Sequence, residues 1–148
     1  MSAAMNEALI APLGRYPAWC RAGDFIYVSG MSARQADGSV AGATQLANGS
    51  VVCDAALQTR IVIGKIEAAL AEAGAALSDC VAVTSYLTDM IHFAAYNAVY
   101  AEFFDGRAAR TTVGVQQLPH PHMAVELTAT AYKPLQPSAR PAGPEEST

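Results

Sequence analysis

The chain has 148 residues, of which 52% are hydrophobic and 15% charged, and it carries a formal net charge of −4. This length and composition predict one globular domain with a single core. Because a phosphate backbone is bound through clustered Lys and Arg, the acidic balance and the lack of a basic run argue against nucleic acid as the main partner.

The sequence also argues against export and against a membrane. It contains neither a signal-peptide pattern nor the roughly 18 consecutive apolar residues that a membrane-spanning helix requires. The three cysteines, Cys20, Cys53 and Cys80, are too widely spaced for a disulfide framework or a CxxC metal site. We therefore expect a cytoplasmic protein whose thiols are structural or incidental.

Both ends of the chain lack an apolar rhythm. Residues 1–10 predict a flexible N-terminus, and the Pro-rich residues 134–148 predict a disordered tail. One domain, 11–133, remains between them. Its first clear element is a strand at 25–30 (FIYVSG), after which Asp37 and Gly38 predict a turn into a returning strand or loop.

A long helix is predicted between Asp54, a suitable N-cap, and Gly74, a suitable C-terminal glycine, because no proline interrupts the segment. Its polar residues fall on two narrow stripes: Gln58, Lys65 and Glu72, and Arg60 and Glu67. Since most of its circumference is apolar, we expect this helix to pack on a sheet and to be nearly covered.

The β-rich run at 80–87 predicts a further strand, and the apolar spacing over 92–104 predicts a second helix. Two more strands complete the element order β-β-α-β-α-β-β. Both helices connect strands, so they can lie on one face of the sheet. The predicted fold class is therefore α+β, with one sheet and two helices.

The last two strands, within residues 108–133, are predicted to form a hairpin. Alternation places side chains such as Val113 and Leu127 toward the core, and Arg110 and Glu126 together on the opposite, small and polar face. Because the charged fraction is low and the mean hydropathy is +0.20, we expect self-association through that face. Arg110 and Glu126 would then line clefts between subunits.

Each of these two residues has a structural and a functional interpretation. Arg110 is either a strand-edge charge in water or a bidentate anchor for a carboxylate. Glu126, among apolar and threonine neighbours, is either half of a structural salt bridge or a carboxylate that orients and deprotonates a water.

Four other side chains are candidates for a site. His120 and His122 are either polar groups at a cleft rim or plain turn residues; a metal site is disfavoured, because the third histidine, His92, opens the second helix. Ser29 lacks a nucleophile elbow and is a candidate polar contact to substrate. Tyr16 either fills the core or donates its hydroxyl. No nucleotide-binding loop occurs, so no nucleotide cofactor is implied.

Taken together, residues 11–133 resemble the RidA/YjgF family of reactive-intermediate deaminases. The resemblance rests on GRYPAWCRAGDFIYVSG, the QTR helix segment, SYLTDM, FAAYNAVYAEFF and AARTTVGVQQLP. It implies a chorismate-mutase-like fold, a homotrimer around a central barrel, and three active sites that lie at subunit interfaces and need no cofactor.

The resemblance also implies roles for individual residues. Arg110 matches the family's carboxylate-binding arginine, Glu126 its water-positioning glutamate, and Tyr16 the tyrosine of its GPY motif. Three further substrate-binding positions match: Ser29, Gly30 and Asn97.

The sequence departs from the family pattern at three positions. Arg15 replaces a proline, Met31 replaces a glutamine, and Thr112 stands where some members have a cysteine. Thr112 remains a candidate substrate contact. These changes put a small substrate of the 2-aminoacrylate type in doubt.

The segments APLGRYP, VTSYL, FFDGRAARTTV and QLPHPHMAVEL resemble the 2-aminomuconate deaminase branch. That branch implies hydrolysis of 2-aminomuconate, a six-carbon enamine dicarboxylate, to 4-oxalocrotonate and ammonia in aromatic degradation. A second carboxylate needs a second anion site, for which Arg15, His120 and His122 are the candidates. Two alternatives stay open: a general 2-aminoacrylate deaminase, and a non-catalytic protein that binds small carboxylates. Whether trimers pair into hexamers also stays open.

Overall fold

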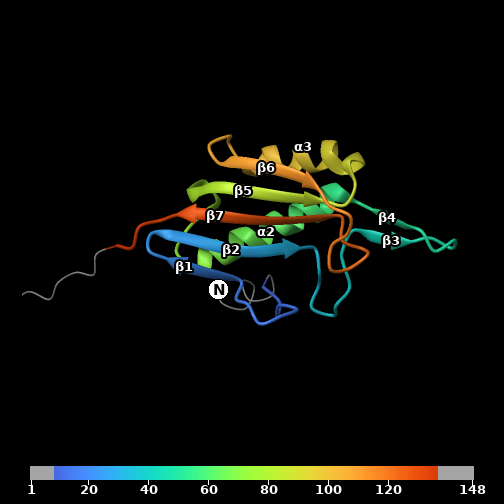
Figure 1. Ribbon diagram of the computed structural model, residues 1–148, viewed down its shortest axis with the longest axis horizontal. Coiled ribbons are helices and arrows are strands. Elements are labelled where there is room, and N and C mark those ends of the chain that lie inside the picture. The colour runs from blue at the N-terminus through green and yellow to red at the C-terminus, as the bar shows by residue number, and fades with distance from the viewer. Residues whose placement is uncertain (1–8, 137–148) are drawn as a thin grey trace, which may run out of the picture.

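The computed structural model describes residues 9–136 as a five-stranded sheet with two α-helices on one face, beside a small two-stranded sheet (Figure 1). The main sheet has the order β1-β2-β7-β5-β6, in which β5 and β6 are parallel and all other neighbours antiparallel. Its strands are β1 (Trp19–Ala22), β2 (Phe25–Ser32), β5 (Cys80–Leu87), β6 (Ala109–Gly114) and β7 (Val125–Tyr132). The helices are α2 (Ala55–Glu72) and α3 (Phe93–Phe103). The predicted α+β fold class is confirmed.

Helix α2 begins and ends where the sequence predicts. The Asp54 carboxylate accepts a hydrogen bond from the Leu57 backbone N–H, and Gly74 just beyond the helix has a φ of 79°, which only glycine adopts readily. Its inner side is fully buried against the sheet through Val62, Ile63, Ile66 and Leu70. The helix is less covered than predicted, since Leu57 is exposed, and Gln58 of the predicted polar stripe is fully buried.

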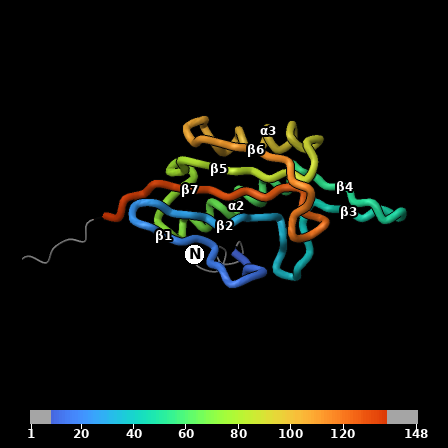
Figure 2. The backbone as a smooth tube through the Cα atoms, viewed as in Figure 1, coloured from blue at the N-terminus to red at the C-terminus, as the bar shows by residue number. Residues whose placement is uncertain are grey.

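The predicted C-terminal hairpin is wrong. Strands β6 and β7 do not pair, because β5 lies between them: Val83 of β5 is opposite Arg110 on one side and opposite Ala129 on the other. Figure 2 traces the chain from β6 past the end of β5 and back along β7. The face assignment of β6 is also wrong, because Val113 is exposed rather than in the core. For β7 the predicted core side is confirmed, since Leu127 is fully buried.

The first part of the chain adds elements that the sequence pattern did not predict. Strand β1 pairs with β2 at the sheet edge, with Trp19 opposite Val28. The turn at Asp37 and Gly38 is present, but the segment after it forms a separate hairpin of β3 (Ala43–Gln45) and β4 (Val51–Cys53). Two short 3₁₀ helices, η1 (Leu77–Asp79) and η2 (Met90–His92), lead into β5 and α3.

Two further expectations concern the ends of the chain and the absence of a membrane-spanning helix. The flexible ends predicted at 1–10 and 134–148 lie mostly outside the described residues, and for residues 1–8 and 137–148 that prediction stays a prediction. Neither described helix is long and apolar enough to span a bilayer.

Candidate active site

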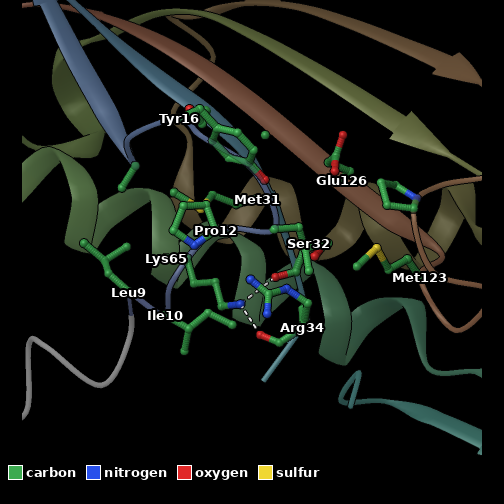
Figure 3. Close-up of a pocket in the computed structure, with 15 residues that line it drawn as sticks. Leu9, Ile10, Pro12, Tyr16, Met31, Ser32, Arg34, Lys65, Met123 and Glu126 are labelled. Carbon is green, nitrogen blue, oxygen red and sulfur yellow. Dashed lines mark hydrogen bonds between the residues drawn. The ribbon is translucent and has the colours of Figure 1, made fainter. Parts of the chain in front are cut away.

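A pocket lies where the end of β2 meets the N-terminal segment, α2 and the start of β7 (Figure 3). It encloses about 600 Å³, its open mouth included. Four of the residues predicted for a site line it together: Tyr16, Ser29, Gly30 and Glu126. Segments far apart in the sequence therefore meet here, as the sequence resemblance implies.

A bulge in β2 shapes this pocket. The register between β2 and β7 shifts between Val28 and Met31, so that Ser29 and Gly30 lie outside the regular ladder. The Ser29 hydroxyl donates to the Pro17 carbonyl oxygen at 2.7 Å, which ties the N-terminal segment to the strand. A Cβ atom at Gly30 would lie 3.0 Å from Oε2 of Glu126, so glycine is what allows the carboxylate to lie over the backbone.

Glu126 is the acidic group of the pocket. It alternates along β7 with fully buried Val125 and Leu127, and its side chain points to the sheet face away from the helices. Burial raises the pKa of the Glu126 carboxyl above its ordinary value. Within residues 9–136 no side chain or backbone group donates a hydrogen bond to this carboxylate. Its oxygens are therefore free to accept hydrogen bonds from a ligand or a water.

The loop before β7 is held by the buried Gln58 of α2. The Gln58 side-chain amide donates to the His122 carbonyl at 2.8 Å and accepts from the Ala124 backbone N–H at 2.9 Å. These two bonds fix the loop that leads directly into Glu126. A buried glutamine that satisfies two backbone groups is a positioning element, since the buried Ala124 N–H would otherwise have no partner and the His122 carbonyl only the Cys53 thiol.

The two loop histidines pack against each other, with ring centroids 4.8 Å apart. The His122 backbone N–H donates to Nδ1 of His120 at 3.0 Å, which holds the His120 imidazole with Nδ1 as an acceptor. His120 lines a neighbouring depression with Thr88 and Gln116, and neither histidine lines the pocket of Glu126. In residues 9–136 no group of three His, Cys, Asp or Glu side chains is arranged to hold a metal.

Arg110 lies on the edge strand β6 and is exposed, yet its guanidinium is well oriented. Nη1 donates to Oδ1 of Asn97 at 2.8 Å, and Cζ lies 4.6 Å from the ring centroid of Tyr100 and 5.4 Å from that of Tyr96. Burial raises the pKa of Tyr100 to about 12, so the ring is neutral and offers its π face to the cation. Thr112, the candidate substrate contact two residues further along β6, lies with its hydroxyl oxygen 3.1 Å from the hydroxyl oxygen of buried Tyr96, at hydrogen-bond distance.

The two central candidates therefore face opposite ways, and the prediction that one sheet face carries both is wrong. Arg110 contacts α3 on the helix-covered side, whereas Glu126 points to the open side, opposite Tyr86. The physical reason is the intervening strand β5. Because β6 and β7 are not directly paired, the faces of their residues cannot be deduced by counting along a shared hairpin. One protomer alone does not bring the guanidinium and the carboxylate into one pocket.

Arg15, proposed with the histidines for a second anion site, is exposed and does not line the Glu126 pocket. Two cationic residues that the sequence analysis did not single out for the site line it instead: Arg34 and Lys65. The spacing of seven between Gln58 and Lys65 on α2 was the available signal, because it puts both on the helix side that faces the site. No sequence pattern marked Arg34.

Known proteins resemble this chain along most of its length. The family profile described as Endoribonuclease L-PSP matches residues 6–133. A RutC family protein of Pyrococcus abyssi is 38% identical, over 86% of this chain and 94% of its own. A second, of Pyrococcus horikoshii, is 37% identical, over 82% of this chain and 90% of its own.

Solved structures agree with this relationship. The RidA protein of the Antarctic bacterium Psychrobacter sp. PAMC 21119 superposes with a TM-score of 0.72 at 25% identity, covering 85% of this chain and 94% of its own. The YjgF gene product of E. coli gives a TM-score of 0.69 at 28% identity, with the same coverage of both chains. The chain belongs to the Endoribonuclease L-PSP family, which includes the YjgF and RidA proteins.

Proposed function

We propose that this protein is a cofactor-independent enamine/imine deaminase whose active sites form between copies of the chain. Family membership supports an imine or enamine deaminase, or a small-molecule-binding role. The observation that carries the proposal is the Glu126 carboxylate, half-buried over Gly30 with no hydrogen bond from residues 9–136. A buried acid free to bind water is suited to general acid-base catalysis.

The substrate's reacting carboxylate is bound by Arg110 of a second copy. Arg110 is exposed on an edge strand and already oriented by Asn97, so it can enter a neighbour's pocket without reorganising. The open sheet face carries exposed aromatic side chains, Tyr27 and Tyr132, which favours burial against other copies. We take the assembly to be the homotrimer that the family resemblance implies.

The proposed reaction begins with the enamine bound by its carboxylate to the guanidinium. The protonated Glu126 carboxyl donates its proton to the enamine carbon, which leaves an iminium cation and the Glu126 carboxylate. Water held by Glu126 adds its oxygen to the imine carbon, while its proton passes through Glu126 to the nitrogen. The carbon–nitrogen bond then breaks, ammonia leaves, and the hydroxyl proton returns to Glu126 as the 2-oxo product forms. Imines hydrolyse readily in water, so orientation and proton transfer suffice.

We propose 2-aminomuconate as the substrate and 4-oxalocrotonate as the product. The similarity of QLPHPHMAVEL to the 2-aminomuconate deaminase branch supports this choice.

The test is ammonia release from freshly generated 2-aminomuconate and from 2-aminoacrylate. We expect turnover of both, with the higher kcat/KM for 2-aminomuconate. Arg110→Ala should lower kcat/KM for both substrates while the oligomer stays intact by size-exclusion chromatography. Unchanged turnover by Arg110→Ala, or no ammonia from either substrate with the wild-type protein, would contradict the proposal.

A further inference from the structure

The pocket of Glu126 has a cationic end formed by Arg34 and Lys65. In Figure 3 these two side chains lie together in the lower part of the pocket, whereas Glu126 lies apart from them near its upper edge. In the same view Tyr16 also lies near the upper edge, to the left of Glu126. The pocket therefore has an acid at one end and two cations at the other.

Arg34 is half-buried and only partly used by the protein. It lies two residues after the end of β2, and its Nη2 donates to the carbonyl oxygen of Ala11 in the N-terminal segment. A guanidinium has five N–H donors, and within residues 9–136 this is the one hydrogen bond that the Arg34 side chain makes. Its other donors remain available to a ligand in the pocket.

Lys65 supports Arg34 from helix α2. Its ammonium donates to the carbonyl oxygens of Ser32, at 2.8 Å, and of Arg34 itself. Burial, and then the positive charge of Arg34, lower the pKa of Lys65 to about 8. The protein thus holds two like charges close together in a partly desolvated place, an arrangement that is unfavourable unless an anion compensates it.

No anion of the described residues does so. The salt bridges within residues 9–136 are Arg60–Glu102, Arg107–Asp105 and Lys133–Asp79, and neither Arg34 nor Lys65 takes part in one. Glu126 lines the same pocket but is not within salt-bridge distance of either cation. The cationic end is therefore available to an anionic group of a ligand whose other end lies near Glu126.

We propose that Arg34, supported by Lys65, binds the distal carboxylate of a linear dicarboxylate substrate. This inference rests on the proposed function for the place of the reacting end, beside Glu126. It assigns the second anion site to residues inside the pocket, in place of Arg15, His120 and His122, which lie outside the pocket of the same protomer.

Binding of two unreactive six-carbon acids tests the inference directly. Muconate and sorbate share the same diene chain, but muconate carries a carboxylate at both ends and sorbate at one. By calorimetry with the full-length protein at pH 7, we expect muconate to bind about 10- to 100-fold more tightly, the range that hydrogen bonds to a charged group contribute. Arg34→Gln should abolish this preference and leave the Kd of sorbate unchanged.

Two other variants make the result specific. Arg34→Lys keeps the charge without the planar fork and should retain part of the preference. Arg60 is an exposed arginine on α2 outside the pocket, so the Arg60→Gln variant should retain the full preference for muconate. The inference is overturned if the wild type binds both acids equally well. It is also overturned if Arg34→Gln weakens muconate and sorbate binding equally, or if the preference for muconate is lost in Arg15→Gln and not in Arg34→Gln.

Kinetics separate this inference from the proposed function. If wild type releases ammonia from both enamines and Arg34→Gln raises KM for 2-aminomuconate alone, both stand. If Arg34→Gln changes both substrates equally, the deaminase remains and the distal site is refuted. If neither enamine is hydrolysed but the Arg34-dependent preference for muconate is measured, the distal site remains and the deaminase is refuted.

Discussion

The Glu126 pocket and the Arg110 edge hold their charges in different ways. Glu126 is half-buried, and burial raises its pKa, yet no group of residues 9–136 hydrogen-bonds to it. Arg110 is exposed to solvent, but it is fixed by Asn97 and by the aromatic rings of α3, including Tyr100. The first region offers an unsatisfied acid inside a pocket, and the second presents an oriented cation outward.

This difference shows that the two groups of the proposed active site lie on opposite faces of the sheet within one protomer. Each of the two lacks what the other provides: the Glu126 pocket has no arginine beside its acid, and Arg110 has no acidic side chain within salt-bridge distance in residues 9–136. Association between copies is the simplest way to join them, and a symmetric assembly would do so at every interface.

The largest effect is expected at the acid. Glu126→Gln keeps the shape but removes proton transfer, so ammonia release should fall about 10²- to 10⁴-fold. The raised pKa means that ionisation costs the folded state; this cost is absent below the ordinary carboxyl pKa and present above the raised one. At neutral pH the variant should therefore melt no lower than wild type. A large loss of thermal stability would instead make Glu126 a structural residue.

The next effect concerns the loop that precedes Glu126. Gln58→Ala leaves the Ala124 N–H without a partner, leaves the His122 carbonyl with only the weak Cys53 thiol donor at 3.6 Å, and opens a cavity, which should cost about 2–4 kcal/mol of unfolding free energy. Chemical denaturation measures this loss. Thr44→Ala, in the hairpin away from the pocket, is the control and should change stability little. A Gln58→Ala protein of wild-type stability would show that the loop keeps its conformation without the hydrogen bonds from Gln58.

A smaller effect is expected from Gly30→Ala. The added Cβ would meet Oε2 of Glu126 at 3.0 Å, and the flexible carboxylate can move aside by a few tenths of an ångström. Turnover should fall roughly 10-fold through misplacement of the acid, with the fold intact. Gly64→Ala adds a methyl in α2 where there is open space and no positive φ, and it tests whether any glycine replacement has this effect. Full activity in Gly30→Ala would argue against a water held over this bulge.

The smallest effect is a pH dependence of the cationic end. The charged or titratable side chains that line the pocket with Lys65 are Arg34, Glu126 and Tyr16. Because the Lys65 pKa is lowered to about 8, its charge is present below this pH and lost above it. Muconate affinity should therefore weaken several-fold as pH rises through about 8 in wild type and much less in Lys65→Met. Equal pH profiles, measured by calorimetry, would remove Lys65 from the site.

The sequence predicted those parts of the fold that depend on local chemistry. Helix α2 was predicted from its cap at Asp54 and the glycine at Gly74, and strand β7 from its alternation. Strand order was not accessible, because pairing of β5 with both β6 and β7 is decided by contacts distant in sequence. Arg110 faces the helices because β6 pairs with β5, where it lies opposite the buried Val83, and its contacts with α3 then accommodate the charge.

The candidate site was predictable to a similar degree. The sequence resemblance grouped Tyr16, Ser29, Gly30 and Glu126, and the structure places all four around one pocket. Arg34 was missed, because its place depends on how the chain bends after the β2 bulge and meets the Ala11 carbonyl. Such a contact between two irregular segments leaves no periodic signal in the sequence.

Complementation between two inactive variants tests the shared site most directly. Arg110→Ala and Glu126→Gln should each be nearly inactive alone. Co-expressed with different tags and purified as mixed trimers, they should recover about a third of wild-type ammonia release, since one of the three interfaces then joins an intact Arg110 to an intact Glu126. Mixed oligomers no more active than the single variants would contradict a site built from two copies.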